Sequence, residues 1–102
     1  MGFKASRRPL VIRTRKTEVS IQQTNVLVVD DEEAIRDMIH FALEKSGMAV
    51  QTASKAHEAL LRINEARPDI ILLDWMMPGV SGLELTRRLR KDAYTEDIPI
   101  IM

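Results

Sequence analysis

The sequence has no cysteine, few aromatic residues and no long apolar run. Without cysteine, its 102 residues cannot form disulfides or use thiolate chemistry, and nothing points to an oxidising compartment. No apolar run approaches the ~20 residues of a membrane span, and 10–12 is too short for a signal-peptide core of about 7–15 residues. Aromatic residues make up 4% of the chain but hydrophobic residues 45%, a globular composition. We therefore expect one folded domain located in the cytoplasm.

The formal net charge is zero, but the charges are unevenly distributed. Residues 1–24 carry a net charge of +5, because six basic residues face Glu18 alone, and residues 25–102 carry −5. This asymmetry predicts a basic N-terminal extension over 1–24, flexible rather than ordered, followed by a folded part over 25–102. The extension has no helical basic stripe and no aromatic interleaving, so we do not expect it to bind nucleic acid.

Short aliphatic runs predict buried strands. Val26–Val29 leads into Asp30 and Asp31, and Ile70–Leu73 leads into Asp74 and a Pro-Gly turn. Runs of this length and composition suit strands buried on both faces of a parallel sheet. Two further strands are expected at 48–53 and 98–102.

Three segments between these strands have helical periodicity. The first is expected to turn one apolar stripe inward: Ala34, Ile35, Met38, Ile39, Ala42 and Leu43. The second, Lys55–Ala66, has Ser54 as its expected N-cap, and the third opens at Ser81 with capping-box spacing to Glu84. Strands alternating with helices predict an α/β fold in three α/β/α layers around a parallel sheet.

Three acids stand at the ends of two predicted strands: Asp30, Asp31 and Asp74. If those strands are neighbours, the carboxylates meet at the carboxyl edge of the sheet, where ligands bind in such folds. Crowded carboxylates call for a cation, and hard oxygen ligands favour Mg²⁺. A carboxylate can also accept a phosphoryl group. The alternative is that the pair caps a helix and Asp74 is a turn acid; spacing alone leaves both open.

Three motifs in combination resemble the receiver domain of two-component response regulators. They are Val28–Glu32, Leu72–Gly82 and Asp97–Met102. The Leu-Leu-Asp-Trp-Met-Met-Pro stretch is most similar to the OmpR/PhoB class, and within it to the phosphate-regulon regulators. The resemblance covers 25–102. It implies a CheY-like (flavodoxin-like) fold with strand order 2-1-3-4-5, and a cytoplasmic phosphorelay function.

The resemblance also implies roles for individual residues. Asp74 would be the phosphoacceptor, forming an aspartyl phosphate. Asp31 would be a direct Mg²⁺ ligand, Asp30 a ligand mainly through water, and Met76 a ligand through its backbone carbonyl. A sensor histidine kinase would donate the phosphoryl group. The module would not be an enzyme in the ordinary sense, although receivers assist their own phosphorylation.

The resemblance further implies elements that lie past Met102. They are a phosphate-reading Ser or Thr, a Lys at the end of a fifth strand, two more helices and any DNA-binding effector domain. We therefore expect a receiver truncated after its fourth strand, without direct nucleic-acid binding. Its open apolar edge could pair with 10–21, in this chain or in another copy, and so allow self-association.

Two other functions remain open. A truncated, non-signalling fragment or decoy would bind Mg²⁺ or the kinase without output. A HAD-type aspartate phosphatase is a more distant alternative, because that chemistry requires a second acid at the position of Met76.

Overall fold

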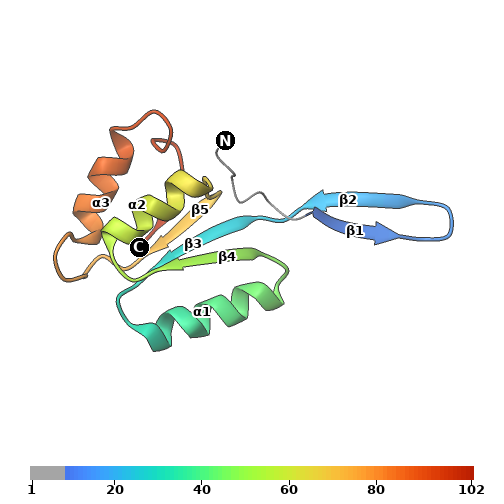
Figure 1. Ribbon diagram of the computed structural model, residues 1–102, viewed down its shortest axis with the longest axis horizontal. Helices are drawn as coiled ribbons and strands as arrows, with labels where there is room; N and C mark the ends of the chain where they lie inside the picture. Colours follow the sequence, from blue (N-terminus) through green and yellow to red (C-terminus); the bar gives the residue numbers. More distant parts are fainter. Residues whose placement is uncertain (1–8) are drawn as a thin grey trace.

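The computed structural model describes residues 9–102 and contains six strands and three helices within that range. Their bounds, in chain order, are β1 Pro9–Arg13, β2 Glu18–Gln22, β3 Asn25–Val29, α1 Glu33–Lys45, β4 Ala49–Ala53, α2 Ala56–Glu65, β5 Ile70–Leu73, α3 Gly82–Arg90 and β6 Ile100–Ile101. Figure 1 shows the β1–β2 hairpin projecting from a body formed by the other elements. None of the helices in the described range is long and apolar enough to cross a membrane.

The central sheet has four parallel strands in the order β4-β3-β5-β6. The strand β3 lies between two neighbours, since Val29 is paired with Ala53 of β4 on one side and with Leu73 of β5 on the other. The expected adjacency of the two acid-bearing strands is confirmed. The order is the receiver order for the first four strands, and the chain described here ends just after β6.

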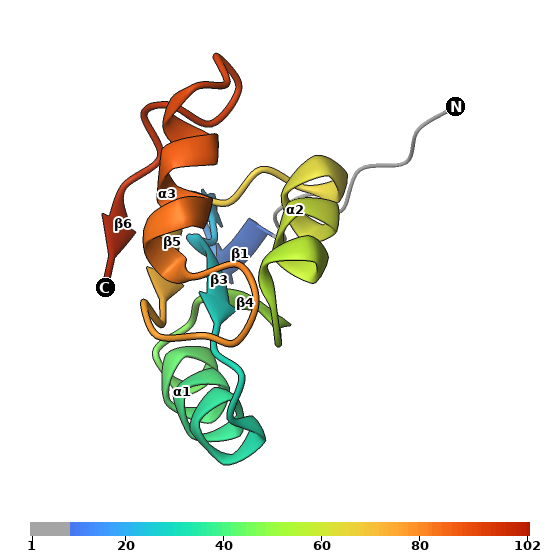
Figure 2. The same cartoon turned by 90° about the vertical axis from the view of Figure 1, so that its left-hand side faces the viewer.

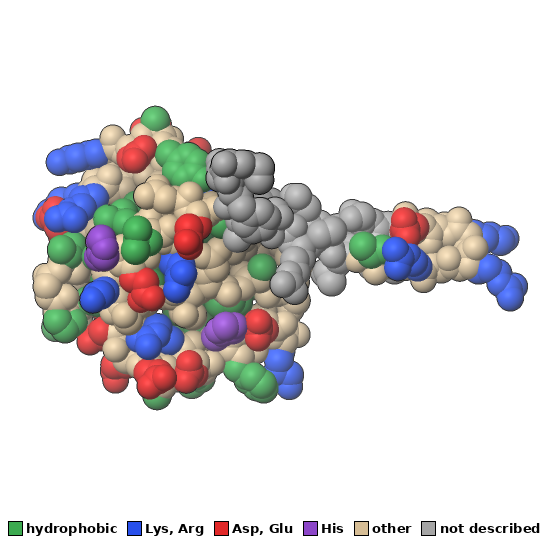
Figure 3. All heavy atoms as spheres, viewed as in Figure 1, with side chains coloured by type: hydrophobic (Ala, Val, Ile, Leu, Met, Phe, Trp, Pro, Cys, Tyr) green, Lys and Arg blue, Asp and Glu red, His purple; other side chains and the backbone are tan. Residues whose placement is uncertain are grey.

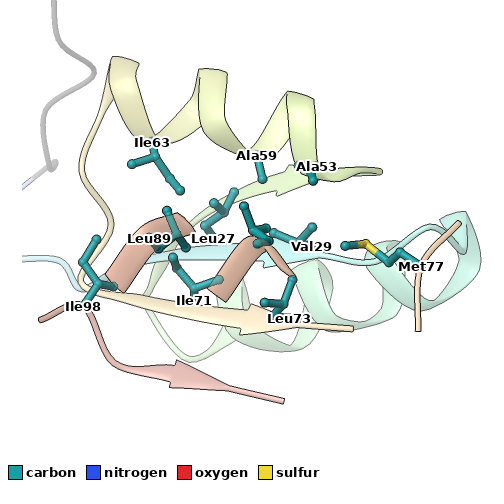
Figure 4. Packing of buried hydrophobic residues seen from close by; sticks show 12 residues of the cluster. Leu27, Val29, Ala53, Ala59, Ile63, Ile71, Leu73, Met77, Leu89 and Ile98 are labelled. Atoms are coloured by element: carbon teal, nitrogen blue, oxygen red, sulfur yellow. The ribbon is translucent and has the colours of Figure 1, made fainter. Parts of the chain in front are cut away.

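The helices cover both faces of the sheet. In Figures 1 and 2, α1 lies on one face and α2 and α3 on the other. Most of the core lies beneath α2 and α3, where inward residues of β3 and β5 meet those of the two helices (Figure 4). This buried cluster comprises Leu27, Val29, Ala53, Ala56, Ala59, Ile63, Ile71, Leu73, Met77, Leu85, Leu89 and Ile98. The predicted three-layer α/β/α arrangement is therefore correct.

The face beneath α1 is packed less completely than the periodicity predicted. No residue of α1 is buried. Ile35, Ile39 and Leu43 are half-buried, while Met38 is 60% exposed and Ala34 and Ala42 are exposed. The full apolar stripe was thus an overestimate, because α1 packs mainly against β4 and, to a smaller extent, β3. For the same reason β5 is fully buried only toward α2 and α3: Ile71 and Leu73 are buried, whereas Ile70 and Leu72 are half-buried.

The described part of the N-terminal extension has regular structure. Residues 9–22 form an antiparallel hairpin in which Val11 is paired with Ser20. The proposed pairing of this segment with the open edge of the sheet is therefore wrong within one chain, because β1 and β2 pair with each other. The division at residue 24 and the flexibility predicted for 1–24 stay predictions, and residues 1–8 lie outside the described residues.

Two local predictions also need adjustment. The N-cap of α2 is Lys55 rather than Ser54, and its side chain makes no capping hydrogen bond. Ser54 instead donates from its amide and its hydroxyl to Glu58 Oε1, at 2.7 and 3.0 Å. The capping prediction for α3 is confirmed, since Ser81 Oγ accepts from the amide of Glu84 at 3.2 Å. The strand β6 is shorter than expected: only Ile100 and Ile101 pair with β5, and Ile98 enters the core before the strand begins.

Candidate functional site

The sheet brings the three acids to one edge. The amide of Asp74 donates to the carbonyl of Val29 at 2.8 Å, and the amide of Asp30 donates to that of Ala53 at 3.1 Å. These hydrogen bonds continue the parallel pairing just past the ends of β5 and β3. Both acids therefore leave the sheet at its carboxyl edge, held by backbone contacts on neighbouring strands.

Each of two carboxylates is oriented by a backbone amide two residues further along. Asp30 Oδ1 accepts from the amide of Glu32 at 2.9 Å, and Asp74 Oδ1 accepts from the amide of Met76 at 3.1 Å. Side-chain contacts of this kind are characteristic of Asp in turns. Each bond uses a single oxygen, so the second carboxylate oxygen of each residue remains available for another ligand.

The carboxylates of Asp30, Asp31 and Asp74 form one cluster. One oxygen from each can be chosen so that all three lie within 4.8 Å of one another. Asp31 is exposed, and Asp30 and Asp74 are half-buried. Three negative groups at this separation repel each other, and a hard divalent cation with oxygen ligands would relieve that repulsion. The cluster predicted from the sequence is therefore present as a geometric arrangement, and its donor set fits Mg²⁺.

Two contacts beside the acids were not predicted from the sequence. Arg36, on α1, donates from Nη1 to the backbone carbonyl of Asp30 at 2.7 Å. Gly82 begins α3 directly against the loop after β5: a Cβ there would lie 2.5 Å from Trp75 Cα and 2.6 Å from the Asp74 carbonyl oxygen. Glycine within the capping box is the sequence signal for this close approach, whereas the capping-box spacing by itself predicts only the start of a helix.

An apolar groove of about 310 Å³ opens beside the acids. It lies between α1 and the half-covered face of the sheet. Its lining includes Asp30, Asp74, Ile39, Leu72, Trp75 and Ile101. Trp75 is 54% exposed, so its ring lies at the surface next to the carboxylates. An indole in this position is suited to report changes in charge at the cluster.

The family model described as the response regulator receiver domain matches residues 26–102. The chain belongs to this family. It is 53% identical over 77 residues to the phosphate regulon transcriptional regulatory protein PhoB of Pseudomonas aeruginosa, an alignment covering 76% of this chain and 34% of PhoB. The Vibrio cholerae chemotaxis protein CheY4 matches with a TM-score of 0.74 at 36% identity, covering 76% of this chain and 65% of CheY4.

Another receiver-family structure is relevant to the acidic edge. The response regulator TrrA of Thermotoga maritima, solved in complex with Mg(2+)-BeF, matches with a TM-score of 0.64 at 39% identity. The alignment covers 68% of this chain and 60% of TrrA. The predicted resemblance to the OmpR/PhoB class and the CheY-like fold are both confirmed. The chain spans about a third of the length of its PhoB relatives.

Proposed function

We propose that this chain is a phosphoryl-accepting receiver module of a two-component system, with Asp74 as the acceptor. A sensor histidine kinase would be the phosphodonor, in the cytoplasm. The observation that carries the proposal is the convergence of Asp30, Asp31 and Asp74 within 4.8 Å at the carboxyl edge of a receiver-type sheet. In this role the module is a signalling domain rather than an enzyme in the ordinary sense.

The same residues would hold Mg²⁺. Asp31 and Asp74 would be direct carboxylate ligands, Asp30 would act mainly through a water molecule, and Met76 would contribute its backbone carbonyl. Oxygen ligands of this number leave room for water and phosphate oxygens, as Mg²⁺ prefers. When bound, Mg²⁺ supplies positive charge that offsets the negative charge of an incoming phosphoryl group.

The chemistry assigned to Asp74 is nucleophilic. A carboxylate oxygen of Asp74 forms a bond to phosphorus as the phosphorus–nitrogen bond of a phosphohistidine breaks, and the electron pair of that bond returns to the imidazole. Asp74 enters this reaction already oriented, because its Oδ1 accepts from the amide of Met76. The product is an acyl phosphate on the carboxylate, formed without loss of atoms from the chain.

A two-stage experiment tests this function. In the first stage, Mg²⁺ is titrated while the fluorescence of Trp75, the single tryptophan, is recorded. Asp31→Ala should weaken the apparent affinity for Mg²⁺ about tenfold or more. This loss is at least as large as the loss that follows removal of a residue supporting a metal ligand. In the second stage, a small-molecule phosphodonor is added with Mg²⁺, and the intact mass is followed for the gain of one phosphoryl group.

The controls separate the proposed function from its alternatives. Asp74→Asn should abolish the mass increase, while Asp37→Asn, which removes an exposed carboxylate from α1, should leave both readouts unchanged. If Mg²⁺ changed the Trp75 fluorescence but no phosphoprotein formed, the chain would be a Mg²⁺-binding decoy rather than a signalling module. The absence of both responses would contradict the metal site and the phosphoacceptor together.

A further inference from the structure

The β1–β2 hairpin presents a cationic tip. Thr14 closes the turn: its amide donates to the Thr17 carbonyl at 2.7 Å, and its hydroxyl oxygen accepts from the amides of Lys16 and Thr17 at 3.3 and 2.9 Å. These bonds order the residues between the two strands. Arg15 and Lys16 consequently occupy the end of the hairpin, and both are exposed.

The charges at the tip are not neutralised locally. Arg13 pairs with Glu18 across the hairpin. For Arg15 and Lys16, no carboxylate among residues 9–102 lies within 4.0 Å. Figure 3 shows basic side chains at the far end of the projecting segment. The tip therefore carries two positive charges free to meet an anionic partner.

The matching negative charge lies at the opposite end of the same molecule. The hairpin precedes the start of β3, whereas Asp30 and Asp31 follow its end. The strand β3 spans roughly 16 Å and the hairpin strands about as much again, and the longest dimension of the molecule is 53 Å. In Figure 1 the hairpin projects away from the start of β3, on the side opposite to the end of β3 that leads into the acids, so the tip does not reach the acidic edge of its own chain.

We propose that the hairpin tip of one copy docks on the acidic edge of a second copy. Arg15 and Lys16 would face the carboxylates of Asp30 and Asp31. The exposed Trp75 beside them offers an aromatic face that favours a guanidinium. Because every copy carries one tip and one edge, the contact either forms twice in a two-fold dimer or repeats head to tail. The inference requires the acidic edge but not the phosphoryl transfer.

Charge and composition favour a second copy over the other anionic partners. Residues 25–102 carry a net charge of −5, which repels a nucleic acid or an anionic membrane and attracts a cationic tip. Residues 9–22 contain no aromatic residue, so the hairpin lacks the stacking side chains typical of single-stranded nucleic-acid sites. The acidic edge is the complementary surface that the structure itself supplies.

The test uses two variants that each lose one half of the contact. The tip variant is Arg15→Glu with Lys16→Glu, and the edge variant is Asp30→Asn with Asp31→Asn. The asparagine side chain retains an oxygen for the amide of Glu32, which protects the local turn. Sedimentation velocity is measured in EDTA at ~50 mM salt, where surface charges are weakly screened. Circular dichroism verifies that both variants are folded.

The expected result is complementation. Wild type associates in a concentration-dependent manner, and its apparent affinity falls about tenfold or more at ~500 mM salt. Each variant alone is monomeric. In a mixture, the intact tip of the edge variant docks on the intact edge of the tip variant. This 1:1 complex grows no further, because its remaining tip and its remaining edge are the mutated ones. Arg87→Glu with Lys91→Glu makes the same charge change on α3 and should associate like wild type.

Three results would overturn the inference. The first is a wild type that remains monomeric at about 1 mM protein. The second is a mixture of folded tip and edge variants that forms no complex although wild type associates, which would indicate an interface made by other surfaces. The third is tip-dependent binding of a DNA duplex or an anionic vesicle by wild type with no mixed complex, which would assign the tip to that partner.

Discussion

Gly82 packs directly against the backbone that carries Asp74. A Cβ atom at position 82 would lie 2.6 Å from the Asp74 carbonyl oxygen and 2.5 Å from Trp75 Cα. Neither obstacle is the flexible end of a side chain, so the main chain itself would have to move. The helix α3 and the acid-bearing loop are thereby held at a separation that only glycine permits.

Gly82→Ala should therefore destabilise the protein. The expected cost is about 1–3 kcal/mol, typical of forcing extra volume into a packed site, and it is measured by urea unfolding. Arg87→Ala, at an exposed position on the same helix, should cost about 0.5 kcal/mol or less. If Gly82→Ala lowered the unfolding free energy no more than Arg87→Ala, the close approach of α3 to the loop would be contradicted.

The buried hydroxyl of Thr95 holds the loop that leads into β6. Thr95 is 3% exposed and donates to the carbonyl of Leu89 at 2.6 Å. Thr95→Val keeps the shape but removes this short hydrogen bond and leaves the carbonyl with the longer one from the Asp92 amide at 3.4 Å, at an expected cost of about 1–3 kcal/mol. Thr52→Val, in the half-buried strand β4, should be close to neutral because valine suits a strand. Equal unfolding free energies for the two variants would contradict the assigned role of Thr95.

Glu58 should make stability depend on pH in the acid range. The hydrogen bond from the Ser54 amide, together with its hydroxyl and the charge of Arg62, lowers the pKa of Glu58 below its ordinary value of 4.5, against the opposing effect of burial. The folded state therefore binds the proton less readily than the unfolded state. The associated stability is present above pH 4.5 and is lost as the pH falls from there through the folded pKa.

Chemical unfolding measured between pH 3 and 7, about the range in which Glu titrates, checks this dependence. Glu58→Gln should be less stable than wild type at neutral pH, and the gap should narrow as the solution becomes acidic. Glu96→Gln, at an exposed position in the loop after α3, is the matched charge control. A gap for Glu58→Gln that stays constant down to the lowest pH would contradict the lowered pKa.

The acidic cluster predicts opposite effects of one substitution with and without Mg²⁺. In EDTA, Asp31→Asn removes one of three mutually repelling charges and should raise stability by about 1 kcal/mol or less, since the group is exposed. With Mg²⁺ at ~100 times its dissociation constant, wild type should gain about 2.7 kcal/mol, and the variant much less. The order of stability of the two proteins should therefore reverse between the two conditions.

Thermal unfolding in EDTA and in Mg²⁺ measures the reversal. Asp37→Asn removes a carboxylate outside the cluster and should respond to Mg²⁺ as wild type does. If Asp31→Asn gained as much from Mg²⁺ as wild type, the cation would be bound elsewhere.

Much of the site could be predicted from local sequence. The aliphatic runs before Asp30 and Asp74 mark where strands leave a core, and the periodic segments between them indicate parallel pairing. Both signals are short-range, because burial on two faces and helical amphipathicity are encoded within about ten residues. The receiver motifs at Leu72–Gly82 then identified the family.

Local sequence therefore encodes the alternation of strands and helices and the acids at the strand ends. The position of β3 between β4 and β5, which brings three carboxylates within 4.8 Å, is apparent only in the folded chain. The same is true of the incomplete burial of α1, the contact of Gly82 with the Asp74 backbone and the pairing of β1 with β2. Each of these depends on contacts between segments distant in the chain or on competition between pairing partners, and local propensity does not encode either.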